Sequence, residues 1–113
     1  MLNINTLARP YAKAAFEYAS AAGQEESWAS MLLLTSKLVT APQVVQQLGN
    51  PALNKQAKVA FLLQLCKKEA DEAFANFLHV LGENGRLSLL PTINGLFTAL
   101  VAEKNRAVEV EVQ

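Results

Sequence analysis

The chain lacks most of the residue combinations on which enzymes and metalloproteins depend. Its 113 residues include one histidine, His79, and one cysteine, Cys66. A single cysteine excludes an internal disulfide, and it favours a reducing compartment. No group of histidine, cysteine and carboxylate side chains has the spacing of a metal site, and no signature of a catalytic nucleophile accompanies His79. We therefore expect no catalytic residues, no cofactor and no metal.

Net charge and long apolar runs are also absent. Ten basic residues balance ten acidic ones, so the chain has no strong field to attract nucleic acid or an anionic membrane. Apolar runs such as Met31–Leu34 and Val59–Leu63 fall far short of the roughly 20 residues that cross a bilayer. Residues 1–5 lack the basic start of a signal peptide. The sequence therefore predicts a cytosolic protein with no nucleic-acid partner and no direct membrane insertion.

What the chain has in abundance is apolar residues at helical spacing. Such residues make up 51% of the sequence, enough for one domain with one core. The pattern predicts helices over about 6–22, 24–40, 54–67, 71–84 and 88–105, with a short helix after Pro42. Gly23 and Gly85 are placed to end helices, and Asp71 to cap one. The prediction is an all-α fold, a compact six-helix bundle over residues 1–105.

The last residues break this periodicity. Ala107–Val112 alternates apolar and acidic residues, and this period of two is typical of a β-strand. A single strand has nothing to pair with in a helical bundle. We therefore expect residues 106–113 to be the linker and first strand of a second, C-terminal domain that this chain does not contain. The alternative is a frayed acidic tail.

The first helix is apolar around too much of its circumference. Arg9, Lys13, Glu17 and Ser20 form one polar stripe, and apolar residues cover the remaining arc of roughly 240°. One side of a small bundle requires an apolar stripe of about 100° or more. The surplus is either buried from two sides or available to a partner.

Three short motifs carry a resemblance to a known family. They are ARPYAKA at residues 8–14, NFL at 76–78 followed by ENGRL at 83–87, and the closing VEVEV at 108–112. In this order they resemble the N-terminal domain of the delta subunit of F-type ATP synthase, a relative of the mitochondrial oligomycin-sensitivity-conferring protein. The resemblance covers essentially the whole chain.

The resemblance implies a non-catalytic subunit of the peripheral stalk, or stator, which joins the catalytic head to the stalk. The implied partner is the amphipathic N-terminal helix of an alpha subunit, held in a groove between the first and fifth helices. The implied second partners, the b-type stalk subunits, bind the C-terminal domain. The implied location is the bacterial cytoplasm, on the cytoplasmic face of the inner membrane as part of the synthase.

The helical wheel divides the first helix between core and groove. We assign Ala12, Phe16 and Ala19 to the core, and a mixed set from the first and fifth helices to the groove. That set is Tyr11, Ala14, Ala15, Tyr18, Ala73, Asn76, Val80 and Asn84. The tyrosines can equally be core-edge residues, and the two faces can be reversed. Trp28 is assigned to the core, and Arg86 to the turn after the fifth helix, where it reaches backbone carbonyls or Glu83.

Two other hypotheses remain open. A helical scaffold can form a homodimer through the surplus apolar arc of its first helix. An all-helical RNA-binding module predicts binding with a steep salt dependence.

Overall fold

The computed structural model of the chain is all-α, and this confirms the predicted fold class. It describes residues 3–66 and 71–112, with side chains as far as residue 106. The elements are α1 (Ile4–Ala22), α2 (Glu25–Thr40), α3 (Pro42–Leu48), α4 (Lys55–Cys66), α5 (Glu72–Glu83), the 3-10 helix η2 (Leu87–Leu89) and α6 (Leu90–Val112). These six α-helices of the described ranges agree with the predicted ones to within a few residues, except at the end of α6.

The strand expected over residues 107–112 is wrong. α6 continues as an α-helix to Val112, and it runs without a break through residue 106, where we expected a linker. A strand needs a neighbouring strand for its hydrogen bonds, and the described part of the chain contains none. Extending an existing helix adds one bond per residue and needs no partner, so the helix prevails over the period-two pattern.

α1 begins earlier than the sequence indicates and contains a proline. Asn3 caps it, because its Oδ1 accepts a hydrogen bond of 2.8 Å from the Asn5 amide. Pro10 lies inside the helix and cannot bond to the carbonyl of Thr6. Both residues are exposed, so water can reach the carbonyl that Pro10 leaves free.

Glycines and an aspartate set the helix ends as predicted. Gly23 and Gly85 have φ of 67° and 68°, a left-handed conformation that glycine adopts without strain. They end α1 and α5. Asp71 starts α5, where its Oδ1 accepts a hydrogen bond of 2.8 Å from the Phe74 amide.

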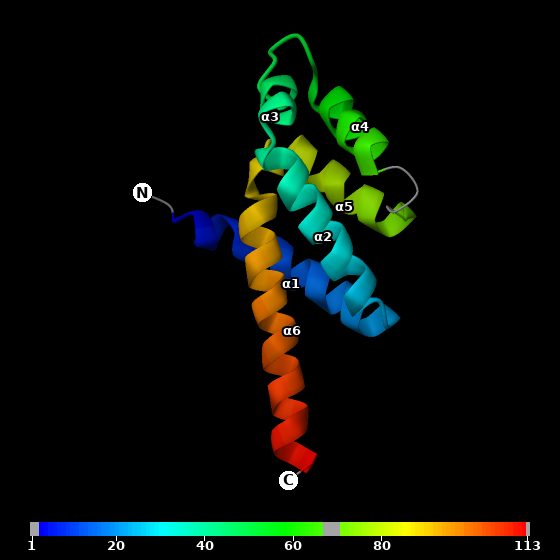
Figure 1. Ribbon diagram of the computed structural model, residues 1–113, viewed down its shortest axis with the longest axis vertical. Coiled ribbons are helices and arrows are strands. Elements are labelled where there is room, and N and C mark those ends of the chain that lie inside the picture. Colours follow the sequence, from blue (N-terminus) through cyan, green and yellow to red (C-terminus); the bar gives the residue numbers. More distant parts are fainter. Residues whose placement is uncertain (1–2, 67–70, 113) are drawn as a thin grey trace.

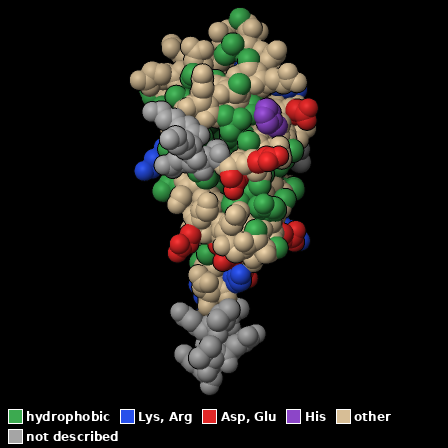
Figure 2. Space-filling model, turned by 90° about the vertical axis from the view of Figure 1, so that its right-hand side faces the viewer, with side chains coloured by type: hydrophobic (Ala, Val, Ile, Leu, Met, Phe, Trp, Pro, Cys, Tyr) green, Lys and Arg blue, Asp and Glu red, His purple; other side chains and the backbone are tan. Residues whose placement is uncertain are grey.

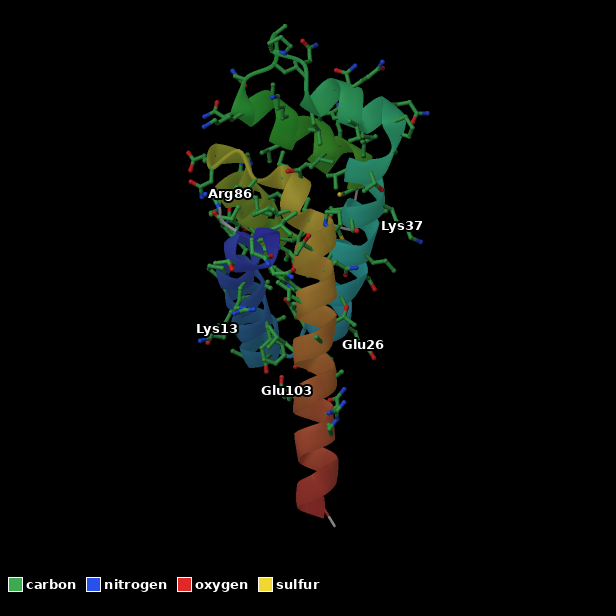
Figure 3. All side chains as sticks on the ribbon, turned by 90° about the vertical axis from the view of Figure 1, so that its left-hand side faces the viewer. Lys13, Glu26, Lys37, Arg86 and Glu103 are labelled. Carbon is green, nitrogen blue, oxygen red and sulfur yellow. The ribbon has the colours of Figure 1, made fainter. Side chains whose placement is uncertain are left out.

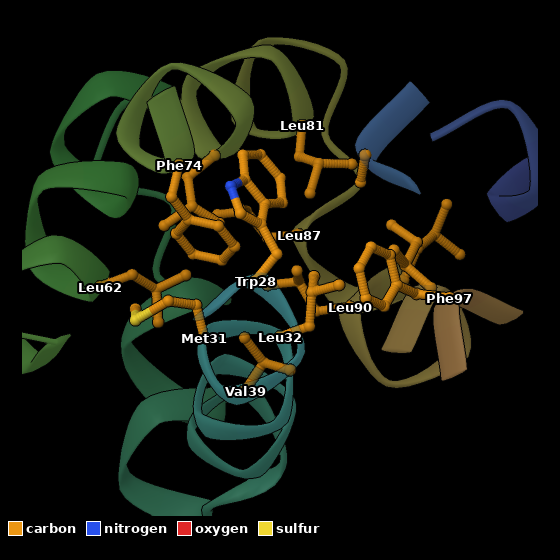
Figure 4. Packing of buried hydrophobic residues seen from close by; sticks show 14 of the residues in the cluster. Trp28, Met31, Leu32, Val39, Leu62, Phe74, Leu81, Leu87, Leu90 and Phe97 are labelled. Atoms are coloured by element: carbon orange, nitrogen blue, oxygen red, sulfur yellow. The ribbon is translucent and has the colours of Figure 1, made fainter. Parts of the chain in front are cut away.

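The helices pack around α6, which contacts both α1 and α2, while α4 packs against α5 (Figure 1). Trp28 is 3% exposed, which confirms its assignment to the core. Figure 4 shows its indole lying among side chains of α5 and η2. The largest fully buried side chains are those of Phe74, Phe97, Leu32, Leu62, Leu78, Leu81, Leu90, Ile93, Val59, Thr35 and Cys66.

α4 and α5 approach each other closely at Gly82. A Cβ atom added there would overlap Cγ2 of Val59, so only glycine fits at this crossing. One turn earlier on α4, Lys55 donates a hydrogen bond of 2.8 Å from Nζ to the carbonyl of Glu83. Among the described residues Lys55 thus takes the role that we expected of Arg86.

Candidate partner-binding surface along α1

The innermost face of α1 is a stripe of alanines. Ala8, Ala12, Ala15 and Ala19 are each at most 1% exposed. Because these side chains are short, the helix lies close against α6 and α2. The stripe separates two flanks of α1, one on the side of α5 and the other on the side of α6. The remaining apolar residues of α1 lie on these two flanks.

Most residues predicted to line a groove between α1 and α5 are accessible. Tyr18 and Val80 are 46% and 48% exposed. The others that reach the surface are Ala14, Asn76 and Asn84, which are exposed, and Tyr11 and Ala73, which are half-buried. Ala15 is the exception: at 1% exposure it packs in the core and offers no surface to a partner.

Side chains join α1 to α5 at two places. At one end the Asn84 Nδ2 donates a hydrogen bond of 3.0 Å to the Tyr11 hydroxyl. At the other, the rings of Tyr18 and Phe77 both lie 5.4 Å from that of Trp28. Tyr11 and Tyr18 are seven residues apart on α1, and Phe77 and Asn84 are seven residues apart along α5 and its C-cap. Because Tyr11 meets Asn84 and Tyr18 lies on the side of Phe77, the two helices run antiparallel over about 10 Å. Of the residues that the sequence analysis grouped, the structure joins Tyr11 and Asn84 directly, and it places Tyr18 against Trp28, which also contacts Phe77 of α5.

Trp28 forms the floor between these helices, and sequence reasoning did not place it there. It comes from α2 and touches Tyr18, Phe77 and also Phe74, at 5.1 Å between ring centroids. The wheel of α2 showed only that Trp28 faces inward. Its Nε1 and the Oε1 of Gln24 are buried without a hydrogen-bond partner among the described residues. The floor is therefore aromatic, and the Trp28 indole N–H and the Gln24 side-chain oxygen are a donor and an acceptor that no described residue uses.

Figure 2 shows hydrophobic side chains gathered on the flank below the histidine, between acidic side chains. Tyr18 on α1 and Val80 on α5 are two large apolar residues with substantial exposure. An accessible apolar face rimmed by polar groups is a feature of protein-binding surfaces.

A second apolar groove lies on the other flank of α1, beside α6. It has a volume of about 350 Å³, and its apolar lining is Ala12, Phe16, Leu96, Ala99 and Leu100. The Phe16 ring packs edge-on against Phe97, with 6.1 Å between centroids. This confirms that Phe16 contacts the core, although it stays half-buried. The sequence analysis missed this groove, whose one signal was the position of Phe16 next to the polar stripe.

The described part of the chain bears on the expectations for metal sites and membrane spans. In residues 3–66 and 71–112 no three histidine, cysteine or acidic side chains are placed to hold a metal ion. The same residues include no helix long and apolar enough to span a bilayer. His79 is exposed on α5, and the hydrogen bonds near the two grooves join or cap helices.

The fold and these surfaces define a helical bundle whose first helix has accessible apolar side chains on one flank and an apolar groove on the other. Residues 7–113 match the family model described as ATP synthase delta (OSCP) subunit, and the chain belongs to this family.

Curated relatives agree with this assignment. The chain is 55% identical over 113 residues to ATP synthase subunit delta of Ectopseudomonas mendocina (strain ymp), covering 100% of this chain and 64% of that protein. It is 49% identical to the protein of the same name from Stutzerimonas stutzeri (strain A1501), with the same coverage. For the protein from Cellvibrio japonicus (strain Ueda107) the identity is 42%, over 99% of this chain and 63% of that protein. The chain thus spans slightly less than two thirds of these relatives.

Proposed function

We propose that the chain is part of a delta-type subunit of the peripheral stalk of an F-type ATP synthase, on the cytoplasmic face of the bacterial inner membrane. In this role it performs no catalysis and couples the catalytic head to the stalk. The family match supports the proposal, as do relatives named ATP synthase subunit delta. We further propose that a second domain, outside this chain, contacts the b-type stalk subunits.

We propose that the groove between α1 and α5 binds the amphipathic N-terminal helix of an alpha subunit. The observation that carries this proposal is the accessible apolar surface of Tyr18 and Val80, 46% and 48% exposed, over a rigid aromatic floor. Apolar residues spaced i, i+3, i+4 and i+7 on a partner helix would lie along such a groove. A tyrosine at the rim adds contact area and a hydroxyl.

The Tyr11–Asn84 hydrogen bond supports a groove that is formed before the partner arrives. It joins the middle of α1 to the C-cap of α5 across 73 positions of sequence. Trp28, fixed between rings on α1 and α5, holds the other end. A surface that is already ordered loses less conformational entropy on binding, so we expect little movement of either helix.

A charge in the groove should abolish most of the binding. Val80→Glu places a carboxylate on the partner-facing side of α5, and its desolvation in the complex should weaken binding by roughly 2 kcal/mol or more. The measurement is calorimetric titration with a peptide of the alpha N-terminus. Tyr18→Glu should act in the same direction, because Tyr18 stands on the opposite wall.

The matched control is Val45→Glu. Val45 is the same residue type, is 50% exposed and lies on α3, away from the groove. It should leave the affinity unchanged. Equal affinities of the Val80→Glu and wild-type chains, both folded by circular dichroism, would reject the groove between α1 and α5 as the binding site.

A further inference from the structure

The groove between α1 and α6 has charged residues of opposite sign at its two ends. On α1 Arg9 and Glu17 stand at opposite ends of the lining, with Lys13 one turn from each, and Glu103 is contributed by α6. Lys104 identifies the acidic end, because its Nζ bonds to Ser20 at 2.8 Å and so sets Glu103 near the C-terminal part of α1. Figure 3 shows Lys13 on α1 and Glu103 further down on α6.

These four charges are not used within the chain. All four residues are exposed. The ion pair recorded near the groove joins Lys104 to Glu25 at 2.9 Å. Within the residues described here, no salt bridge or side-chain hydrogen bond involves Arg9, Lys13, Glu17 or Glu103. The apolar groove is thus bounded by a free positive end and a free negative end.

The floor and length of the groove fit a helix. Ala99 is short and exposed, so the backbone of a guest helix can come close. Arg9 and Glu17 are eight residues apart on α1, which is about 12 Å or two helical turns. Apolar side chains at i, i+4 and i+7 of a guest would span this distance.

We propose that this groove binds an amphipathic helix of a second partner protein, basic at its N-terminal end and acidic at its C-terminal end, which lies antiparallel to α1. Its basic end would face Glu17 and Glu103, and its acidic end Arg9 and Lys13. The positive end of the guest's helix dipole would also face the two glutamates. Two copies of this chain would meet concave face to concave face, which favours a guest helix over a homodimer here.

The test uses two labelled 18-residue peptides that share one stripe of leucine and alanine. One has two lysines in its first turn and two glutamates in its last, and the other has these charges exchanged. Fluorescence anisotropy at low ionic strength measures their affinity for the 113-residue chain. We expect the first peptide to bind about tenfold more tightly than the second, and the difference to shrink in high salt.

A charge exchange in the protein controls for any difference in helix stability between the two peptides, because the peptides stay the same and only the groove changes. The Lys13→Glu and Glu103→Lys double variant should reduce or invert the preference between the same two peptides. Ala99→Glu, in the floor of the groove, should weaken both peptides at least tenfold. Val45→Glu, on α3 and away from both flanks of α1, should change neither.

Several results would overturn the proposal. One is that neither peptide binds up to millimolar concentration. A second is that the double variant does not alter the preference between the two peptides. A third is that Val80→Glu abolishes binding and Ala99→Glu does not. A concentration-dependent dimer that Ala99→Glu dissociates in sedimentation would assign the groove to a second copy instead. Loss of binding in Val80→Glu would support the surface between α1 and α5 as a helix-binding site, and the other results do not bear on that surface.

Discussion

At the scale of single residues, the sequence specifies burial better than it specifies function. The wheel of α1 correctly places Ala12 and Ala19 in the core and Tyr18 at the surface. It places Ala15 wrongly, because Ala15 and Ala14 are adjacent and equally apolar, so only the packed fold separates them. The contacts of the floor residue Trp28 could not be predicted from the sequence for a similar reason. A wheel shows that a residue faces inward but not which helices it contacts.

Gly82 is a second residue whose role depends on packing. Its Cα faces Cγ2 of Val59 on α4, and a β-branched valine in a helix has one strongly preferred rotamer. Gly82→Ala should therefore reduce the free energy of unfolding by roughly 1–3 kcal/mol, although alanine is the better helix former. Urea denaturation measures this change.

The matched control is Gly95→Ala in α6. A Cβ at Gly95 meets nothing within 4 Å, so the gain in helix propensity acts alone. We expect it to raise stability by about 0.5–1 kcal/mol. If the two variants shift stability equally, the close approach of α4 and α5 is not what requires glycine at position 82.

At the scale of whole elements, the helices were predictable because each carries its own signals. Apolar spacing located them, and Gly23, Asp71 and Gly85 marked their ends. The segment 107–112 shows the limit of this method. Its alternation is typical of a strand, yet whether a strand forms depends on a neighbour that a local pattern cannot supply. The helix α6 extends through it instead.

The end of α1 is tied to α2 and α6 by one lysine. Lys104 donates 2.8 Å and 2.9 Å hydrogen bonds to Ser20 and Glu25. Its side chain is 42% exposed, so solvent screens the ion pair and the contribution is small. Lys104→Ala should lower the free energy of unfolding by less than about 1 kcal/mol, with a smaller loss in high salt.

Lys37→Ala is the comparison for this change, since Lys37 is exposed on α2 and forms no salt bridge within the described residues. Thermal denaturation at two salt concentrations measures both variants. A loss of several kcal/mol, or a loss independent of salt, would mean that Lys104 does more than this surface clamp.

At the scale of the whole molecule, the position of α1 in the bundle explains why this helix has more apolar residues than the side facing the core requires. It buries its alanine stripe against the bundle, leaves Tyr18 accessible on the flank that faces α5, and forms an apolar groove with α6 on the other flank. The groove between α1 and α5 stays a prediction that comes from the resemblance. The groove beside α6 depends on how two helices cross, and a wheel of either helix alone does not contain that information.

The dimensions of the molecule reflect a bundle from which one end of α6 projects. The described chain extends 56 Å in its longest direction and 21 Å in its shortest, and α6 accounts for much of that length (Figure 1). The bundle itself occupies the end where α1, α2 and α5 meet. Both grooves therefore lie along the bundle, above the projecting end of α6.

The central claim is that a partner helix binds between α1 and α5. Amide chemical-shift mapping of the 113-residue chain, titrated with a peptide of the alpha N-terminus, tests it most directly. We predict that the largest shifts cluster at Tyr11, Tyr18, Val80 and Asn84, with a change in the fluorescence of the single tryptophan, Trp28, beneath them. Shifts that cluster on α3 and α4 instead, or none at an excess of peptide, would contradict the claim.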